Sequence, residues 1–318
     1  MGITGGKYVG TTRLDGKTAI ITGCNTGIGK ITAKEFYRIG ARVIMACRDI
    51  NKTEDAAKEI KETVLPSDDS KVGEVIIHKL DLSSLASVRE CAKKILDTEP
   101  NIHLLINNAG VMACPKSTTD DGFEMQFGVN HLGHFLFTSL LLPRIIKSSP
   151  ARIINVSSRA HERGRIDFND LNWEKKSYSP LGAYSQSKLA NVLFTVELNK
   201  RLRENGITGV NTYALHPGVV ETELGRNLDS AYFNGARWIT SKVIYFILKT
   251  PEQGAQTTLY CALDKAVENE TGLYYSDCKI KSPSRAARDE ESAKRLWEES
   301  MTLVGMANSD PFQDLNKK

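Results

Sequence analysis

The sequence predicts an α/β fold with a doubly wound, mostly parallel sheet, and three observations support this. Strand-like and helix-like segments alternate from residue 18 to about residue 220, which is typical of crossover units that join parallel strands. Several strand-like segments are apolar throughout, as strands covered on both faces are. A glycine-rich turn separates the first strand from the first helix. The chain has 318 residues, enough for one large domain with a substantial core.

The strands expected before residue 220 are short apolar runs bounded by turn residues or polar loops. They cover residues 18–22 (TAIIT), 41–47 (ARVIMAC), 74–80 (EVIIHKL), 102–106 (IHLLI), 152–158 (RIINVSS) and 209–218 (GVNTYALHPG). Helices are expected between them over residues 30–40, 50–63, 84–96 and about 122–147, with another from about residue 182. Gly40 is placed near the end of the first helix. Pro143 predicts a kink or a stop in the fourth helix.

The last hundred residues are expected to complete the same domain. They contain an apolar stretch (231–248), a helix after Pro251, a strand at 272–277 (GLYYSD) and a terminal helix over about 284–304. No repeat, low-complexity tract or linker divides the chain. We therefore expect a single domain over residues 1–318.

The composition is that of a globular protein without a strong charge bias. Hydrophobic residues make up 41%, charged residues 25%, and the net charge is +4, with no block of like charge that would indicate nucleic-acid binding. None of the six cysteines forms a C-x-x-C pair, so free thiols in a reducing compartment are expected and no metal site is predicted. The longest apolar runs, 135–142 and 243–248, are far shorter than the roughly 20 residues that span a bilayer. We expect an intracellular protein that is either cytoplasmic or peripherally associated with the endoplasmic reticulum membrane.

The turn after the first strand indicates a nucleotide. It reads TGCNTGIGK (22–30), with glycines at positions 23, 27 and 29. Glycine lets the backbone approach a ligand closely, and the first N–H groups of the following helix then face a pyrophosphate. The spacing differs from the common G-x-G-x-x-G fingerprint. Its position between the first strand and first helix is what favours a phosphate-binding turn.

The end of the second strand predicts NADP rather than NAD. A carboxylate there would accept a hydrogen bond from the ribose 2′-hydroxyl of NAD, whereas an arginine accommodates the 2′-phosphate of NADP. The sequence MACRD places Cys47 at the expected acidic position and Arg48 directly after it. The alternative is that Arg48 is an ordinary exposed residue and that Asp49 points inward instead.

Polar motifs follow the other strands at the ends where open parallel sheets bind ligands. They are LDLSS with Asp81 and Leu82, NNAG (107–110), NVSS (155–158) and HPG (216–218). Each alone is consistent with turn chemistry. Their common position and order favour one shared site.

The segment GAYSQSKLANVLF (182–194) places a phenol and an ammonium four residues apart. Tyr184 and Lys188 therefore share one face of a helix. A nearby cation favours phenolate and lowers the pKa of a tyrosine from its reference value of about 10. We expect Lys188 to lower the pKa of Tyr184, so that Tyr184 exchanges a proton near neutral pH.

These motifs together resemble the short-chain dehydrogenase/reductases. T-G-x-x-x-G-x-G, N-N-A-G, a serine after the fifth strand, Y-x-x-x-K and P-G match over about residues 14–222. ACRD, INNAGVMACP, DGFEMQFGVNHLGHFLFTSLLL, RIINVSSRAH, SKLANVLFTVEL, HPGVVETEL and YYSDCK are similar to the retinol dehydrogenases of that family. The resemblance implies a Rossmann-type sheet. It also implies an N-terminal extension (1–13), a cofactor-binding and catalytic core (14–225), and a substrate-side lid with C-terminal elements (226–318).

The resemblance also implies roles for individual residues. Tyr184 is expected to be the general acid/base, Lys188 its electrostatic partner, Ser158 the residue that holds the carbonyl, and Asn130 a support for proton relay. The N-x-x-S pattern selects Ser158 over Ser157. NADP(H) is expected to contact Gly23, Asn25, Thr26, Gly27, Ile28, Gly29, Arg48, Asp81, Leu82, Asn108, Ala109, Gly110, Tyr184, Lys188, Pro217, Gly218 and Thr222.

The expected substrate is an apolar alcohol or aldehyde, and the resemblance favours a retinoid-like one. The alternatives are a steroid, isoprenoid or xenobiotic carbonyl, or a non-catalytic NADP-binding interaction protein. The presence of Tyr184, Lys188 and Ser158 argues against the last. Residues 237–248 are expected to form a helix that covers the substrate or rests peripherally on the endoplasmic reticulum membrane. The alternative is that they are ordinary core. A homodimer is also considered.

Two histidines near Asn130 are considered as metal ligands. His131 and His134 are three apart, but no third ligand follows them in the sequence. Helix packing is the preferred interpretation. His161, after the serines, is interpreted as a loop residue, with substrate contact as the alternative.

Overall fold

The computed structural model describes residues 5–64, 71–220, 248–309 and 311–312. Its centre is one eight-stranded sheet with the order β3-β2-β1-β4-β5-β6-β7-β8. All neighbouring strands are parallel except β7 and β8, which are antiparallel. The strands are β1 (Thr18–Thr22), β2 (Arg42–Cys47), β3 (Glu74–Lys79), β4 (Leu104–Asn107), β5 (Ala151–Val156), β6 (Val210–His216), β7 (Leu273–Ser276) and β8 (Lys279–Ile280). The predicted doubly wound α/β fold is confirmed.

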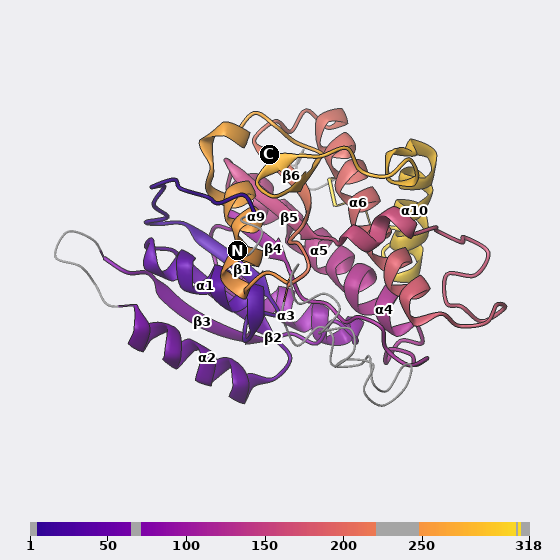
Figure 1. Cartoon of the computed structure of the whole chain (residues 1–318), viewed down its shortest axis with the longest axis horizontal. Helices are drawn as coiled ribbons and strands as arrows, with labels where there is room; N and C mark the ends of the chain where they lie inside the picture. Colours follow the sequence, from indigo (N-terminus) through magenta and orange to yellow (C-terminus); the bar gives the residue numbers. More distant parts are fainter. Residues whose placement is uncertain (1–4, 65–70, 221–247, 310, 313–318) are drawn as a thin grey trace.

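Helices cover both faces of this sheet (Figure 1). One face packs against α1 (Gly27–Arg38), α2 (Ile50–Thr63) and α9 (Pro251–Leu263). The other packs against α3 (Leu85–Thr98), α5 (Gly133–Lys147) and α6 (Pro180–Glu204), and α10 (Glu290–Leu303) lies over α5 and α6. The shorter helices are α4 (Met125–Phe127), η1 (Gly128–Leu132), η2 (Arg159–Arg163), η4 (Lys265–Val267) and η5 (Ala286–Arg288). The central strands β1 and β4 are buried along their whole length, which explains their unbroken apolar sequences.

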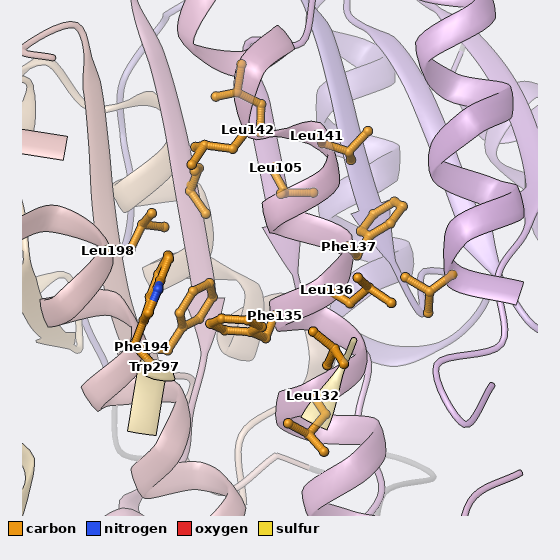
Figure 2. Close-up of a cluster of buried hydrophobic side chains, with 14 of the residues drawn as sticks. Leu105, Leu132, Phe135, Leu136, Phe137, Leu141, Leu142, Phe194, Leu198 and Trp297 are labelled. Atoms are coloured by element: carbon orange, nitrogen blue, oxygen red, sulfur yellow. The ribbon is translucent and has the colours of Figure 1, made fainter. Parts of the chain in front are cut away.

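The C-terminal helix is held on the outside of α5 and α6 by aromatic side chains (Figure 2). The ring of Trp297 lies 5.0 Å from that of Phe135 and 5.9 Å from that of Phe194, measured between centroids. Because α10 covers this side, α5 is buried on almost every face, and its sequence FLFTSLLL has little helical amphipathicity.

Several predicted helix boundaries were wrong. The helix expected over 122–147 begins at Met125, where Glu124 accepts hydrogen bonds from the N–H groups of Gln126 and Phe127. It contains a five-residue π turn, closed by the N–H of Gly133 on the carbonyl of Gly128. Pro143 lies inside α5 without ending it.

The first and last predicted helices also shift. The first begins at Gly27 rather than residue 30, so the glycine turn leads directly into the helix. The last begins at Glu290, because Asp289 accepts a hydrogen bond from Ser292 N and caps it there.

No helix in the described ranges is both long enough and apolar enough to cross a bilayer. Residues 221–247, which include Thr222 and most of the segment considered for substrate or membrane contact, lie outside the described residues. The proposed division at residues 13 and 225 stays a prediction.

Candidate active site

Parallel strands end at one edge of the sheet, and the predicted site residues gather there. Tyr184 is 4% exposed and Lys188 is 3% exposed on α6, the long helix that follows β5 and η2. The Nζ atom of Lys188 lies 5.8 Å from the centroid of the Tyr184 ring, and it donates to the carbonyl of Val156 at 3.0 Å. The predicted phenol–ammonium pair is therefore a neighbouring, buried pair.

The two serines after β5 point to different partners. The Ser158 side chain lies close enough to the Tyr184 hydroxyl to lower the pKa of Tyr184 against the effect of burial. Ser157 instead donates its hydroxyl to the backbone carbonyl of Lys188 at 2.7 Å and is 2% exposed. Ser158 is thus the serine placed beside the phenol, while Ser157 ties β5 to α6.

The expected lowering of the Tyr184 pKa is not found. Burial raises the pKa of Tyr184 to about 12, and the opposing effect comes from the Ser158 side chain. Burial also lowers the pKa of Lys188 to about 8. Both shifts have one cause, because a low-dielectric site disfavours the charged form of either group. The helix face supplied the spacing, but it did not reveal how completely α6 is buried.

Asn130 lies in the π turn and joins this pair to the turn after β4. Its side chain accepts from Val111 N at 2.8 Å and donates to Val111 O at 2.9 Å. It also donates to Ser187 Oγ, 2.9 Å away on α6. A Cβ atom at Gly110 would lie 3.2 Å from Asn130 Oδ1 and 3.5 Å from Lys188 Nζ. The turn, Asn130 and Lys188 therefore share one small space.

The glycine turn has the geometry that a phosphate site needs. Gly23 has φ +62, and a Cβ atom there would lie 2.7 Å from the Cβ of Ala109, so a larger residue would strain the backbone and clash. Thr26 is the N-cap of α1 but makes no side-chain capping bond, and no acidic residue lies in the first turn. The helix start therefore keeps N–H groups available for an anion.

The side chain of Asn108 connects the glycine turn to the end of β4. Its side-chain amide donates to the carbonyls of Thr22 at 2.9 Å and Gly23 at 3.0 Å. A Cβ atom on Gly29 would lie 2.6 Å from the same amide nitrogen. Asn25, Gly27 and Ile28, also predicted for the cofactor, are partly exposed at the same turn.

Arg48 and Asp49 follow the end of β2. Arg48 is exposed and follows the buried Cys47. The Asp49 carboxylate accepts from Lys52 N at 3.1 Å and caps α2, rather than pointing inward. Cys24 in the glycine turn is fully buried, and its thiol donates to Ile21 O at 3.1 Å.

The remaining predicted cofactor residues lie at neighbouring strand ends. Asp81 accepts from the backbone and the hydroxyl of Ser83, at 3.0 and 2.6 Å, and Leu82 is 7% exposed. Pro217 and Gly218 follow β6, and Gly218 N donates to His216 Nδ1 at 3.0 Å.

The histidines do not share a site. His131 Nε2 lies 2.8 Å from Ser300 Oγ on α10, and His134 Nε2 lies 2.8 Å from Thr22 Oγ1 on β1. No cluster of three potential metal ligands occurs among the described residues. His161 Nδ1 donates to the carbonyl of Ser158 at 2.7 Å, which places it behind that serine.

Sequence reasoning did not identify Thr22 and His134 as parts of this site. Thr22 Oγ1 accepts hydrogen bonds from Asn108 N and Ala109 N, both at 3.0 Å. The one available signal was the spacing of Asn130 and His134, which places two polar side chains one turn apart in an apolar helix.

Comparison with known proteins agrees with this architecture. The family model described as short chain dehydrogenase matches residues 17–232. Retinol dehydrogenase 13 of Homo sapiens is 50% identical over 304 residues, which cover 96% of this chain and 89% of that protein. Retinol dehydrogenase 11 of Homo sapiens is 49% identical over 304 residues, covering 96% and 91%.

A solved structure extends the agreement to three dimensions. The crystal structure of an uncharacterized protein from Mycobacterium Paratuberculosis has a TM-score of 0.74 and 38% identity, and covers 95% of this chain and 98% of that one. The chain therefore belongs to the short chain dehydrogenase family and is an oxidoreductase that binds a nicotinamide dinucleotide.

Proposed function

We propose that this protein is an NADP(H)-dependent oxidoreductase that interconverts retinol-like alcohols and retinal-like aldehydes. The observation that carries the chemistry is the placement of Ser158 and of the buried pair Tyr184 and Lys188 beside the turn after β4. The names of the relatives, at 49–50% identity over nearly the whole chain, support the retinoid substrate.

The side chains suit proton transfer to a carbonyl. The nicotinamide supplies or accepts the hydride when the cofactor is bound. Negative charge then builds on the carbonyl oxygen, and donors aimed at that oxygen stabilise it. Tyr184, protonated because burial raises its pKa to about 12, donates the proton in the reductive direction, and Ser158 donates a second hydrogen bond. Alcohol oxidation requires the phenolate, which the positive charge of Lys188 favours.

A substrate panel tests the proposal. NADPH oxidation is measured with all-trans-retinal, a steroid ketone, farnesal and a small aromatic aldehyde. We expect the highest kcat/KM with all-trans-retinal. A higher value for the steroid or farnesal would contradict the retinoid assignment and leave carbonyl reduction intact. No turnover with any of them, together with normal NADPH binding, would favour a non-catalytic role.

The cofactor preference rests on Arg48. Its guanidinium is exposed at the end of β2, and the neighbouring Asp49 is engaged in capping α2. Arg48→Ala is expected to weaken NADP(H) binding about tenfold to a hundredfold, because charge-assisted hydrogen bonds contribute roughly 1.5–3 kcal/mol. NAD(H) binding should change little. Fluorescence titration with NADPH and NADH measures both.

Arg38→Ala is the matched control for Arg48. Arg38 is an exposed arginine at the end of α1 that pairs with Glu35, so its removal should leave both affinities unchanged. Equal weakening of NADPH and NADH by Arg48→Ala would contradict the assignment of the 2′-phosphate to this residue.

The pKa of Lys188 predicts a pH dependence. Burial lowers this pKa to about 8, so Lys188 is charged below pH 8 and loses its proton as the pH rises. The charge of Lys188 also stabilises the phenolate that remains when Tyr184 donates its proton. Because kcat/KM reports groups of the free enzyme, kcat/KM for retinal reduction should fall as pH rises through about 8. A flat profile between about pH 6.5 and 9.5 would contradict the need for a charged Lys188.

Unfolding gives a check that does not depend on activity. The lowered pKa means that burial destabilises the charged form, and this penalty is fully present below about pH 8. It is relieved as the pH rises from about 8 towards the ordinary value of 10.5. The unfolding midpoint of the wild type, relative to Lys188→Met, should therefore rise across this window.

Membrane contact, endoplasmic reticulum association and dimer formation remain parts of the proposal. The segment considered for membrane contact lies almost wholly outside the described residues. Flotation with phospholipid vesicles and analytical ultracentrifugation measure lipid binding and oligomeric state, respectively.

A further inference from the structure

A series of hydrogen bonds connects the turn after β4 with β1 and with the π turn that contains Asn130. It begins at the turn after β4, where Asn108 N and Ala109 N each donate to Thr22 Oγ1 at 3.0 Å. Thr22 Oγ1 lies 2.8 Å from His134 Nε2. His134 Nδ1 lies 3.0 Å from the backbone oxygen of Asn130. Thr22 and Asn130 are fully buried and His134 is 2% exposed.

The direction of each bond in this series is determined. A carbonyl oxygen only accepts, so His134 Nδ1 carries the proton. Burial lowers the pKa of His134 to about 4, so the ring is neutral and its Nε2 accepts. Thr22 must then donate its hydroxyl proton to His134, which leaves its oxygen lone pairs for the two backbone N–H groups. The other acceptor near the Thr22 hydroxyl, the carbonyl of Ile106, is 3.5 Å away and is a poor alternative.

The series continues from Asn130 to the catalytic helix. Asn130 Nδ2 donates to Ser187 Oγ at 2.9 Å, and Ser187 Oγ donates to the backbone oxygen of Tyr184 at 2.8 Å. The charge of Lys188 is close enough to lower the pKa of His134 further, after the larger effect of burial. One histidine thus connects the turn predicted to hold the cofactor with the residues predicted to move the proton.

We propose that His134 is a positioning residue, which holds the cofactor turn through Thr22 with one ring nitrogen and the π turn of Asn130 with the other. This inference rests on the proposed function. The π turn departs from ordinary helical geometry, so a side-chain donor on its central carbonyl fixes where the Asn130 amide points. Thr22 correspondingly fixes the N–H groups of Asn108 and Ala109.

Replacing His134 by Asn or Gln tests its hydrogen bonds to Thr22 and to Asn130 separately. The amide of His134→Asn reaches about as far as Nδ1, so it keeps the bond to Asn130 and loses Thr22. The longer amide of His134→Gln reaches about as far as Nε2, so it keeps Thr22 and loses Asn130. His134→Phe keeps an aromatic ring and loses both. Each variant is assayed for kcat with all-trans-retinal, for the NADPH dissociation constant by fluorescence, and for its unfolding midpoint.

The expected result is a split between kcat and cofactor affinity. His134→Asn should weaken NADPH binding about tenfold with kcat within about threefold of the wild type, because only the Thr22 connection is lost. His134→Gln should lower kcat about tenfold and leave NADPH binding nearly unchanged. His134→Phe should show both losses. Thr22→Val should reproduce the loss of His134→Asn, and Thr22→Ser, which keeps the hydroxyl, should restore wild-type binding.

His131→Phe is the matched control. His131 occupies the same π turn, is 1% exposed, and contacts Ser300 on α10 instead of the cofactor turn. Its replacement should lower the unfolding midpoint without changing kcat or NADPH affinity. If His134→Phe does not fold, the Asn and Gln variants carry the test.

The inference is overturned if the Asn and Gln variants lose the same parameter, or if all His134 variants lose stability alone, as His131→Phe should. Failure of the proposed function would appear in the wild-type protein itself, as an absence of NADPH binding or retinal turnover. Failure of the inference would appear only as the wrong pattern among variants of an active protein.

Discussion

Replacing Tyr184 by Phe is expected to lower kcat about a hundredfold to ten-thousandfold, the range that general acid–base catalysis contributes. The substitution keeps the buried ring and removes the hydroxyl beside Ser158. Without that proton donor, the charge that builds on the carbonyl oxygen is not neutralised. NADPH binding should remain within about threefold of the wild type, since the fold and the glycine turn are untouched. Single-turnover kinetics with retinal and fluorescence titration with NADPH measure the two quantities.

Tyr213→Phe is the matched control for this substitution. Tyr213 is fully buried on β6 and donates its hydroxyl to Val267 O at 2.7 Å, away from the strand ends. Loss of that hydroxyl should reduce stability by about 1 kcal/mol and spare turnover. Near-normal turnover by the Tyr184→Phe protein would refute the mechanism.

Replacing Lys188 is expected to affect both turnover and cofactor binding. Lys188→Met keeps much of the buried chain length, but it removes the ammonium beside Tyr184 and the donor to Val156 O. We expect kcat to fall about a hundredfold, because the positive charge no longer favours the phenolate in alcohol oxidation. NADPH affinity should fall about tenfold, since Lys188 lies next to Gly110 in the turn predicted to contact the ribose.

Lys200→Met on the same helix provides the comparison. Lys200 is exposed and pairs with Glu290 at 3.3 Å, and exposed pairs of this kind contribute little to stability. Its replacement should change neither kcat nor NADPH affinity. An unchanged kcat for retinol oxidation in Lys188→Met would show that the charge of Lys188 does not act on Tyr184.

The strands were the most predictable part of the fold. The helical segment after β4, which comprises α4, η1 and α5, was the least predictable. β1, β2 and β4 are covered on both faces, so nearly every position must be apolar and each strand is visible as a short apolar run. The π turn over 128–132 adds one residue to a turn, and a single-residue shift cannot be distinguished in a segment that is apolar on nearly every side.

The candidate site was likewise predictable only in part. The sequence by itself determined which chemical groups follow each strand. Because the carboxyl ends of parallel strands lie at one edge of the sheet, it also predicted that these groups share one site. It also placed Tyr184 and Lys188 on one helix face, since that depends on local geometry alone.

Only the tertiary structure decided the surroundings of those groups. The pKa of Tyr184 is raised rather than lowered because burial disfavours the phenolate, and α6 is packed against the sheet, η1 and η2. Thr22 meets His134 across 112 positions, and Asp49 accepts a hydrogen bond from the first turn of α2. Burial and long-range hydrogen bonds depend on which segments pack together, and a linear pattern of residue types does not contain that information.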